Sequence, residues 1–439
     1  MWPYRPDLLA RAVPRYTSYP TAAEFHGGIG EADMRQAIAA IPAGERVSLY
    51  VHIPYCREIC WYCGCNTGAA NRSGRLAAYL DALDREINLV GALLPAGVET
   101  VRIAFGGGSP NALSPLQFAR LVDRLVTRFR AAGATLSIEL DPRTLDAAWI
   151  DTIGAIGIAQ ASLGVQSFAA HVQRAIGRVQ PPELIAHATA ALRAAGVRSL
   201  NFDLMYGLPD QSAADFDETL EQAEALAPDR LAIFGYAHLP ALLPRQRRID
   251  GAALPDGEAR FRQAWRAWDR LTAAGYRPIG FDHFARPGDP LAIAASARQL
   301  RRNFQGFTED QCETVIGLGA SAISRFPGLL AQNEKLAGRY RMRVSAGRLA
   351  TQRGTARSAD DRRRGAAIER LLCIGSARID DDLIEPAWAM LRPYAEAGLV
   401  LREGNRLIVP QEGLPYARSI ASGLDAYRNQ SSGTFSRAV

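Results

Sequence analysis

The sequence lacks any apolar stretch long enough to cross a membrane, and it contains few cysteines and almost no lysine. Spanning a bilayer takes about 20 consecutive apolar residues. The first residues, from Met1 to Asp7, also lack the apolar core of a signal peptide. We therefore expect a cytoplasmic protein without a membrane span. Six cysteines occur in 439 residues, and Lys335 is the one lysine among 51 basic residues.

The overall composition is that of an ordinary globular protein. Hydrophobic residues make up 48% of the chain and charged residues 22%, and the formal net charge is +6. The charge run of residues 360–364 mixes both signs, which argues against a nucleic-acid partner. A small polyanionic substrate is compatible with the positive charge.

Short apolar runs alternate with helical patterns through the first three quarters of the chain, which is typical of βα units around a parallel sheet. The predicted strands are Ser48–Ile53, Thr100–Phe105, Thr135–Leu140, Gln160–Gln166, Leu200–Tyr206 and Arg230–Tyr236. The predicted helices include Arg75–Leu94, Pro115–Ala132, Pro182–Ala195 and Ala213–Ala227. Two later apolar runs, Tyr276–Phe284 and Thr314–Ser324, extend or flank the sheet. Right-handed crossovers then predict an α/β fold of the barrel or part-barrel kind.

Three regions follow from this pattern. Residues 1–45 are rich in proline and form an N-terminal segment, residues 46–330 form the barrel domain, and residues 331–439 form a small C-terminal domain. The polar stretch Arg339–Arg364 is interpreted as an excursion from the barrel. Later helices followed by a hairpin, with its turn at residues 403–405, predict a winged-helix-like domain. It has no basic recognition face, so we interpret it as a lid or packing module.

Four cysteines lie within ten residues directly after the first predicted strand. Cys56, Cys60 and Cys63 form a C-x3-C-x2-C arrangement, and Cys65 follows two residues later. Three thiolates can bind three irons of a [4Fe–4S] cubane and leave the fourth iron open. A structural zinc site is the alternative, although it usually takes four ligands in separated pairs. The neighbouring rings of Tyr55, Trp61 and Tyr62 either exclude water from a cluster or pack in the core.

A glycine run ends the second predicted strand. Gly106, Gly107 and Gly108 are followed by Ser109 and Pro110. Glycine lets the backbone approach a ligand that any Cβ would obstruct, although tight turns also use glycine. At the carboxyl end of a barrel strand, where ligands of such folds bind, the binding interpretation is favoured.

The cysteine loop after a first barrel strand resembles the radical S-adenosylmethionine superfamily. The resemblance extends over nearly the whole chain, which is similar to the bacterial oxygen-independent coproporphyrinogen III dehydrogenases. The segments that carry it are Pro14–Thr21, Tyr236–Pro240, Asp282–Pro287, Asn303–Gly306 and Phe435–Arg437. Cys65 separates this family from related haem chaperones, which usually have an aromatic residue there. The resemblance implies a partial (β/α)6 barrel of the TIM type with an N-terminal extension and a small C-terminal domain.

The resemblance also implies the cofactors and their residues. These are a [4Fe–4S] cluster on Cys56, Cys60 and Cys63, and two molecules of S-adenosylmethionine in one active site, with Cys65 and Tyr50 in catalytic roles. Contacts of the cluster-bound nucleotide correspond to Tyr50, Gly107, Glu139 and Ile323. Contacts of the second nucleotide correspond to Tyr62, Gly108, Ser109, Gln166, Arg178, Asp203 and Ala237. The chain departs from the family pattern at Ser109, where threonine is usual, and at residues 312–314, which we expect to alter a contact near Ile323.

Each of these residues also has a plainer interpretation. Glu139 and Asp203 have the residue type of strand-end or helix-capping acids, and Arg178 that of a surface ion pair. Outside family motifs, buried histidines are more often hydrogen-bonded packing residues than catalysts; the histidines in such motifs are His52, His238 and His283. Cys312 and Cys373 have the pattern of small buried apolar residues.

The family reaction is the oxidative decarboxylation of two propionates of coproporphyrinogen III to vinyl groups, by way of a 5′-deoxyadenosyl radical. Arginine binds carboxylates through paired hydrogen bonds, which makes Arg15 and Arg437 candidate clamps for this tetrapyrrole unless they form surface ion pairs. The resemblance implies a reductant such as flavodoxin or ferredoxin, and we expect a monomer. A radical methyltransferase acting on haem and a haem chaperone share the barrel and cluster loop, and so remain alternatives.

Overall fold

Seven parallel strands form the middle of the protein. The computed structural model describes residues 1–70 and 73–428. In order across the sheet, the parallel strands are β13 (Thr314–Leu318), β1 (Arg46–Ile53), β4 (Glu99–Gly107), β5 (Thr135–Leu140), β6 (Gln160–Gln166), β7 (Ser199–Tyr206) and β8 (Arg230–Gly235). The six predicted βα strands are confirmed, and their ends differ from the prediction by at most two residues.

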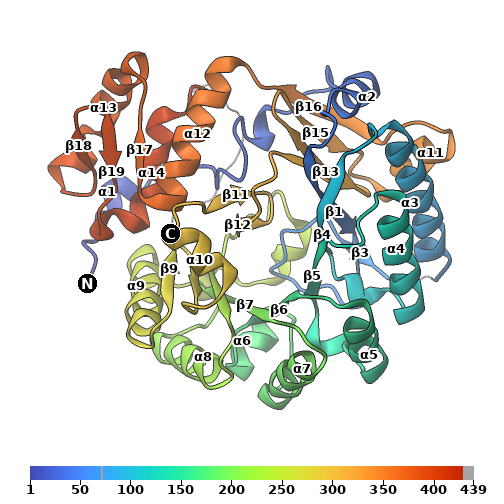
Figure 1. Cartoon of the computed structure of the whole chain (residues 1–439). Helices are drawn as coiled ribbons and strands as arrows, with labels where there is room; N and C mark the ends of the chain where they lie inside the picture. Colours follow the sequence, from blue (N-terminus) through green and yellow to red (C-terminus); the bar gives the residue numbers. More distant parts are fainter. Residues whose placement is uncertain (71–72, 429–439) are drawn as a thin grey trace.

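Antiparallel strands extend the sheet at both sides to twelve strands. They are β14 (Ile323–Phe326), β15 (Leu329–Asn333) and β16 (Thr351–Ala356) beyond β13, and β10 (His283–Ala285) and β9 (Arg277–Ile279) beyond β8. The two later apolar runs therefore extend the sheet, as predicted. With β16 and β9 at its edges, the sheet is an open, curved part-barrel (Figure 1). The predicted α/β fold class is confirmed.

Helices cover the outer face of the curved sheet, one after most parallel strands (Figure 1). They are α3 (Ser73–Leu93), α4 (Pro115–Arg128), α5 (Ala147–Ile156), α7 (Pro182–Ala194), α8 (Ala213–Ala225) and α9 (Gly257–Ala273). Several begin at a capping side chain: Ser114, Asp146, Ser212 and Asp256 each accept a hydrogen bond from a backbone N–H in the first turn. None of the helices in the described ranges is long and apolar enough to cross a membrane.

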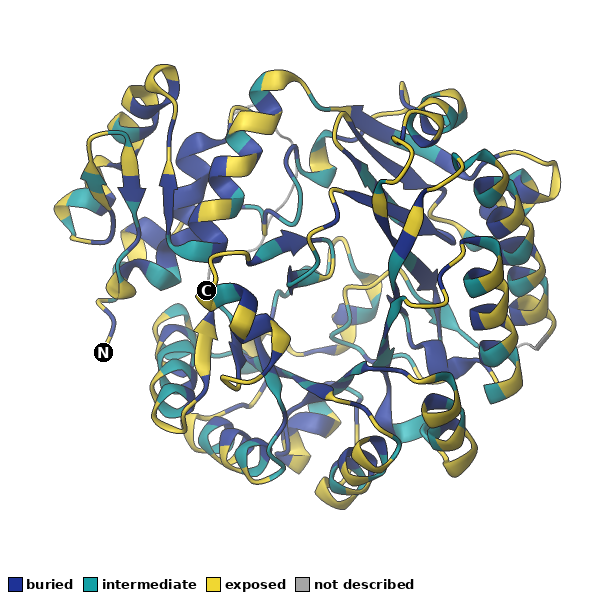
Figure 2. Cartoon of the chain, viewed as in Figure 1, coloured by how far each residue is buried: buried dark blue, intermediate teal, exposed yellow. Residues whose placement is uncertain are grey.

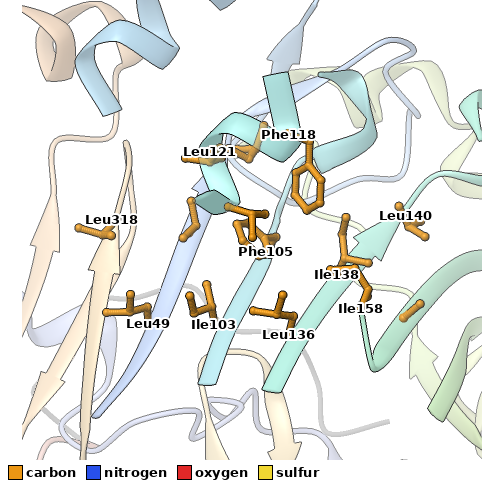
Figure 3. Packing of buried hydrophobic residues seen from close by; sticks show 14 of the residues in the cluster. Leu49, Ile103, Phe105, Phe118, Leu121, Leu136, Ile138, Leu140, Ile158 and Leu318 are labelled. Carbon is orange, nitrogen blue, oxygen red and sulfur yellow. The ribbon is translucent and has the colours of Figure 1, made fainter. Parts of the chain in front are cut away.

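The main core lies between these helices and the sheet. Leu49, Ile103 and Leu136 occupy neighbouring positions on β1, β4 and β5, so they form one row across the sheet (Figure 3). Phe118 of α4 lies over Phe105, with ring centroids 4.9 Å apart. Burial of each such side chain stabilises the fold by about 1.5–3 kcal/mol. This packing therefore fixes where the carboxyl ends of the strands lie.

Shorter elements complete this part of the chain. They are α1 (Pro6–Leu9), α2 (Glu31–Ala39), β2 (Tyr55–Cys56), β3 (Gly68–Ala69), α6 (Ala170–Ala175), α10 (Pro290–Ser296), β11 (Arg301–Asn303), β12 (Gly306–Thr308) and α11 (Ala337–Ser345), with 3-10 turns at Ala22–Glu24, Pro110–Ala112, Pro142–Thr144, Pro244–Arg248 and Gly251–Ala253.

The interpretation of Arg339–Arg364 as an excursion is wrong. This stretch holds most of α11, all of β16 and the start of the next helix. Tyr340 and Val344 of α11 are buried in the main core, while Arg339 is exposed, so the polar composition of this stretch conceals an amphipathic helix. Because β15 and β16 belong to the large sheet, we propose that the C-terminal domain starts after Ala356 instead of at residue 331.

The C-terminal domain has a winged-helix-like order of elements and its own core. It contains α12 (Ala359–Ile374), β17 (Ser376–Arg378), α13 (Asp381–Glu396), β18 (Leu401–Glu403), β19 (Arg406–Ile408) and α14 (Ala417–Ala421), with 3-10 turns at Gln411–Tyr416 and Ser422–Leu424. Its three strands pair in the order β17, β19, β18, and the hairpin that the sequence predicts is present. Figure 2 shows that the inner sides of these elements are buried and their outer sides exposed.

The N-terminal segment packs into that second core. Leu8, Leu9, Tyr16 and Tyr19 are buried there with residues of α12, α13 and α14. The hydroxyl of Tyr16 donates a hydrogen bond of 2.9 Å to Asp425. The two ends of the chain therefore stabilise each other beside the barrel.

A buried carboxylate connects α3 to the far side of the sheet. Glu86 accepts hydrogen bonds from Gly319 N (2.6 Å), Asn333 Nδ2 (2.7 Å) and Tyr340 Oη (2.8 Å). Burial raises the pKa of Glu86 to about 7, although these three donors favour the ionised form. Glu86 thereby fixes the turn between β13 and β14.

We expect Glu86→Gln to lower the free energy of unfolding by about 1–3 kcal/mol. The NH2 group of the new amide would face groups that themselves donate hydrogen bonds, so one buried donor would lose its acceptor. The folded-state pKa is raised above the unfolded value, so wild-type stability from this carboxyl is largest below about pH 4.5 and is lost as the pH rises through about 7. The difference in the free energy of unfolding between wild type and Glu86→Gln should therefore decrease from about pH 4.5 to about pH 7.

Urea midpoints at pH 5 and pH 8 measure this difference. Asp81→Asn, an exposed acid on the same helix, is the control and should change stability by less than about 0.5 kcal/mol. A difference that increases with pH would contradict the assigned pKa shift.

Candidate functional site

The four clustered cysteines lie at the carboxyl end of the parallel strands. After β1 the chain enters a loop in which Tyr55 pairs with Gly68 and Cys56 with Ala69. Cys56, Cys60, Cys63 and Cys65 all line one cavity of about 550 Å³. This is the end of the sheet where barrel folds bind their ligands. The predicted placement of the loop is confirmed.

The glycine run holds this loop against β4. Gly108 N donates to Ile53 O and Ser109 N to Tyr55 O, each over 2.8 Å. A Cβ on Gly108 would come within 2.5 Å of Tyr55 O. Gly107 has φ of +103°, and a Cβ there would overlap the His52 ring. The glycines therefore serve backbone packing and also line the cavity.

Two arginines donate hydrogen bonds to the sulfur of Cys60. The Nη2 atom of Arg143 and the Nη1 atom of Arg178 each lie 3.3 Å from Sγ. Asp141 lies between the two guanidinium groups, 2.6 Å from Arg143 and 3.3 Å from Arg178. Although burial alone raises the pKa of Asp141, these arginines hold it below its usual range. Arg178 is only 6% exposed, so the surface ion-pair interpretation of Arg178 is wrong.

The other cysteines have contrasting electrostatics. The thiol and the backbone N–H of Cys65 donate hydrogen bonds to Cys63, which lowers the pKa of the Cys63 thiol to about 6. The same hydrogen bond raises the pKa of Cys65 well above its usual value. Burial raises the pKa of Cys56 to about 12. Of these three thiols, Cys63 is thus the one most readily ionised before any metal binds.

These residues fit an iron–sulfur cluster. Three cysteine thiols share one cavity, and the sulfur of Cys60 receives two guanidinium hydrogen bonds of the kind that stabilise bound thiolates. Within residues 1–70 and 73–428, no three His, Cys, Asp or Glu side chains gather around a single metal ion. A [4Fe–4S] cubane does not require three side chains around one metal ion, because each thiolate binds a separate iron.

Two acids reach the cavity from inside strands. Glu139 of β5 accepts a hydrogen bond of 3.1 Å from Gly107 N, and burial raises its pKa to about 7. Asp203 of β7 accepts hydrogen bonds from Ser162 Oγ (3.0 Å) and Asn201 Nδ2 (2.8 Å), and burial raises its pKa too. Neither acid caps a helix. Asp203 lies inside β7, so the strand-end interpretation is wrong for Asp203, whereas Glu139 is the penultimate residue of β5.

Gln166 ends β6 in an unusual conformation. Its φ is +69°, in the left-handed region that few residues other than glycine adopt, and the pairing of β6 with β7 shifts register between Gly164 and Gln166. Both features turn this end of β6, and Gln166 lines the cavity. Strained backbone of this kind is concentrated at ligand sites. The acids, Gln166 and the glycine-lined wall together fit a nucleotide with an amino-acid moiety.

Most of the predicted site residues meet in this cavity. Besides the cysteines, its lining contains Arg15, Tyr62, Gly107, Gly108, Ser109, Glu139, Gln166, Arg178, Asp203 and Ala237. Tyr50 and Ile323 are not part of the lining; the hydroxyl of Tyr50 bonds to His52, and the backbone of Ile323 packs on Gly317, which pairs with Tyr50. Arg437 lies outside the described residues.

The family departure at residues 312–314 lies at the amino end of β13. Cys312 is buried there, and its carbonyl oxygen accepts a hydrogen bond of 2.8 Å from Arg325. Gly317, which contacts Ile323, lies near the carboxyl end of the same strand. The altered contact near Ile323 stays a prediction.

The aromatic and histidine residues mostly have structural roles. Tyr55 packs against Tyr79, and a Cβ on Gly177 would overlap the ring of Trp61, so core packing describes both. Each histidine of the family-like motifs has a hydrogen-bonded neighbour: His52 with Tyr50, His238 with Tyr236 and His283 with Asp282. Burial lowers the pKa of His52 to about 4.

Sequence reasoning missed several cavity residues. Asp141 follows β5 directly and lines the cavity, and Arg143, two residues later, contacts Cys60; their place after a parallel strand was the signal that could have identified them. Arg245 and Gln246 come from a 3-10 turn after β8; Gln246 Nε2 donates to the carbonyl oxygens of Tyr62 (2.8 Å) and Ala237 (3.1 Å). No sequence pattern indicates that this turn folds back over the cysteine loop.

The comparisons with known proteins agree with this geometry. Residues 50–223 match the model of the radical SAM superfamily. The oxygen-independent coproporphyrinogen III oxidase of Bradyrhizobium diazoefficiens is 43% identical, with 97% of each chain covered. The protein of the same name from Escherichia coli is 39% identical, with 95% of this chain and 93% of that one covered.

A solved structure also matches along the whole chain. It is coproporphyrinogen III oxidase from Escherichia coli, described as a radical SAM enzyme, with a TM-score of 0.91, 37% identity, and coverage of 97% of this chain and 99% of that one. Membership of the superfamily implies a [4Fe–4S] cluster and S-adenosylmethionine, both of which fit the residues around the cavity. With relatives of about 40% identity over nearly its full length, the chain belongs to the oxygen-independent coproporphyrinogen III oxidases, a family of radical SAM enzymes.

Proposed function

We propose that this enzyme converts coproporphyrinogen III to protoporphyrinogen IX in haem biosynthesis without oxygen. Two propionate groups become vinyl groups; each loses one hydrogen atom to the adenosyl radical, one electron to an external one-electron acceptor, and CO2. The observation that carries the proposal is the convergence of Cys56, Cys60 and Cys63 with Glu139 and Asp203 on one cavity, in a chain that matches relatives of this name end to end.

The cysteines would hold the cluster at the cavity wall. A reduced cluster held there would supply the electron that releases a 5′-deoxyadenosyl radical from bound S-adenosylmethionine, and that radical would take hydrogen from the propionate β-carbon. Arg143 and Arg178 keep the Cys60 sulfur hydrogen-bonded. Apolar side chains, among them Leu140 and Met205, also line the cavity.

We further propose two nucleotide sites in this cavity. Glu139 orients its carboxylate through Gly107 N–H and, with Tyr50 and Ile323 nearby, would bind the nucleotide on the open iron. Asp203 is held by Ser162 and Asn201, which leaves it suited to accept hydrogen bonds from a ribose hydroxyl pair. The other proposed contacts of this second nucleotide are Tyr62, Gly108, Ser109, Gln166, Arg178 and Ala237.

An external one-electron reductant is also part of the proposal. Flavodoxin or ferredoxin would serve, and we expect a cytoplasmic monomer. The N-terminal segment and the C-terminal domain would enclose the tetrapyrrole, since Arg15 lines the cavity.

Anaerobic incubation with reductant, S-adenosylmethionine and coproporphyrinogen III tests the function. Protoporphyrinogen IX, released CO2 and 5′-deoxyadenosine are the expected products. A methylated tetrapyrrole would instead indicate a methyltransferase, and tight haem binding without turnover would indicate a chaperone.

The cluster ligands are tested by serine substitution. Cys56→Ser, Cys60→Ser and Cys63→Ser should each abolish the reconstituted cluster and nucleotide cleavage, because a cubane with an open iron needs all three thiolates. Cys65→Ser should retain about four irons per chain. Iron and sulfide analysis with absorption spectra measures this, and a Cys65→Ser protein without cluster would contradict the ligand assignment.

Gly108→Ala should also lose the cluster. The added Cβ would meet the backbone of Ile53 and Tyr55, which cannot move without displacing the cysteine loop. Overpacking of this kind costs about 1–3 kcal/mol. Gly133→Ala, which meets nothing within 4 Å, is the control and should reconstitute normally. Equal iron content in the two variants would refute the role of the close approach.

Asp203→Asn should separate the two nucleotide sites. We expect normal cluster spectra and one bound S-adenosylmethionine, with the second bound about tenfold or more weakly, because a charged acceptor is lost. Anaerobic equilibrium dialysis measures the stoichiometry, with the exposed Asp151→Asn as control. A variant that binds two nucleotides with unchanged affinity would rule out this site.

A further inference from the structure

A second, smaller pocket opens beside the reaction cavity. Its volume is about 60 Å³, and its lining shares Arg15, Phe234, Gly235 and Tyr236 with the lining of the reaction cavity. Such a volume holds a few water molecules, which matches a carboxylate tail and excludes a macrocycle. The two spaces are thus neighbours with a common wall.

Three arginines line this pocket, and they come from three separate parts of the chain. Arg15 belongs to the N-terminal segment, Arg260 to α9 of the barrel domain, and Arg418 to α14 of the C-terminal domain. We name this pocket the arginine compartment. It is completed only where all three parts of the molecule meet.

The barrel makes room for Arg260 at two glycines. A Cβ on Gly207 would lie 2.5 Å from Nη1 of Arg260, and a Cβ on Gly235 would lie 3.3 Å from Nη2. The guanidinium also lies over the ring of Tyr206, 5.8 Å from its centroid. The end of β7 and the end of β8 therefore hold this guanidinium at the compartment wall.

Arginines outnumber acids among the described residues that line the compartment. Among the described residues that line the compartment, Asp282 is the one acid, and it also accepts a hydrogen bond of 2.6 Å from His283. Arg302 lies close by, stacked on Phe281 at 5.0 Å, and its buried Nη1 atom has no hydrogen-bond partner within residues 1–70 and 73–428.

The guanidinium of Arg418 is buried close to other arginines. It is only 6% exposed, and burial lowers its pKa to about 10, with Arg15 and Arg302 lowering it further through repulsion. An anion placed between these arginines would relieve both effects. Carboxylates suit such a site because guanidinium groups bind them through paired hydrogen bonds.

We propose that the arginine compartment binds the propionate carboxylates that the reaction leaves intact. This inference rests on the proposed function, in which two of four propionates react and two are retained. Arg15, Arg260 and Arg418 would anchor a retained carboxylate while the reacting propionate lies in the adjoining cavity. The C-terminal domain then supplies a substrate-binding residue in addition to any role as a lid.

Binding of two fluorescent porphyrins to the reconstituted enzyme tests the inference. Coproporphyrin III carries four propionates, and protoporphyrin IX carries only the two that the reaction retains. Arg418→Gln and Arg260→Gln should weaken the binding of both porphyrins about tenfold or more, because a charge-assisted hydrogen bond is lost. Arg392→Gln, an exposed arginine on α13, is the matched control and should bind both like wild type.

Cluster absorption and nucleotide cleavage without substrate verify that each variant is folded. Should Arg418→Gln not fold, Arg260→Gln decides, because its side chain is less buried. Unchanged affinity for both porphyrins would overturn the inference, and so would a loss confined to coproporphyrin III, since the arginines would then hold the reacting propionates. A wild-type enzyme that cleaves the nucleotide but neither binds coproporphyrin III nor forms a vinyl product would instead overturn the proposed function.

Discussion

The close approach of two backbone segments determines the geometry of the site. Gly108 and Ser109, at the end of β4, donate hydrogen bonds to carbonyl oxygens on either side of Pro54, at a separation that admits no side chain. This contact fixes where the cysteine loop leaves β1. It also places Gly107 N–H against Glu139, and the hydroxyl of Ser109 accepts a hydrogen bond from Asp141 N. The sheet thus positions the cysteine loop through contacts between main-chain atoms, which cannot change rotamer as side chains can.

Buried charge near the cysteines is balanced within a small volume. Asp141 carries the negative charge that offsets the repulsion between the two arginines beside the Cys60 sulfur. Replacement of one member would leave a buried charge without its partner, which typically costs 3–5 kcal/mol. The described lining of the arginine compartment instead holds three arginines and one acid, which suits a site that binds an anion.

The sequence was sufficient for the sheet and insufficient for what folds over it. Apolar runs such as Thr135–Leu140 and Gln160–Gln166 coincide with β5 and β6, in which every second residue is buried. The cysteines and the glycine run were also found, since their spacing reflects local chemistry. By contrast, the left-handed Gln166, the turn that brings Gln246 over Tyr62, and the place of Arg418 all depend on contacts distant in sequence. Amphipathic α11 was missed because its arginines give the stretch a polar composition, although two of its residues are buried.

The pairing of the two ends of the chain has a consequence for biosynthesis. Tyr16 and Asp425 are 409 residues apart, yet they form one hydrogen bond in a shared core. On the ribosome the N-terminal segment emerges first and waits for its partner until nearly the entire polypeptide has been made. The barrel strands, whose neighbours follow closely in sequence, form their contacts earlier. A truncated translation product can therefore possess the cysteine loop but not the compartment that Arg15 shares with Arg418, so the ability to hold an anionic substrate is acquired last.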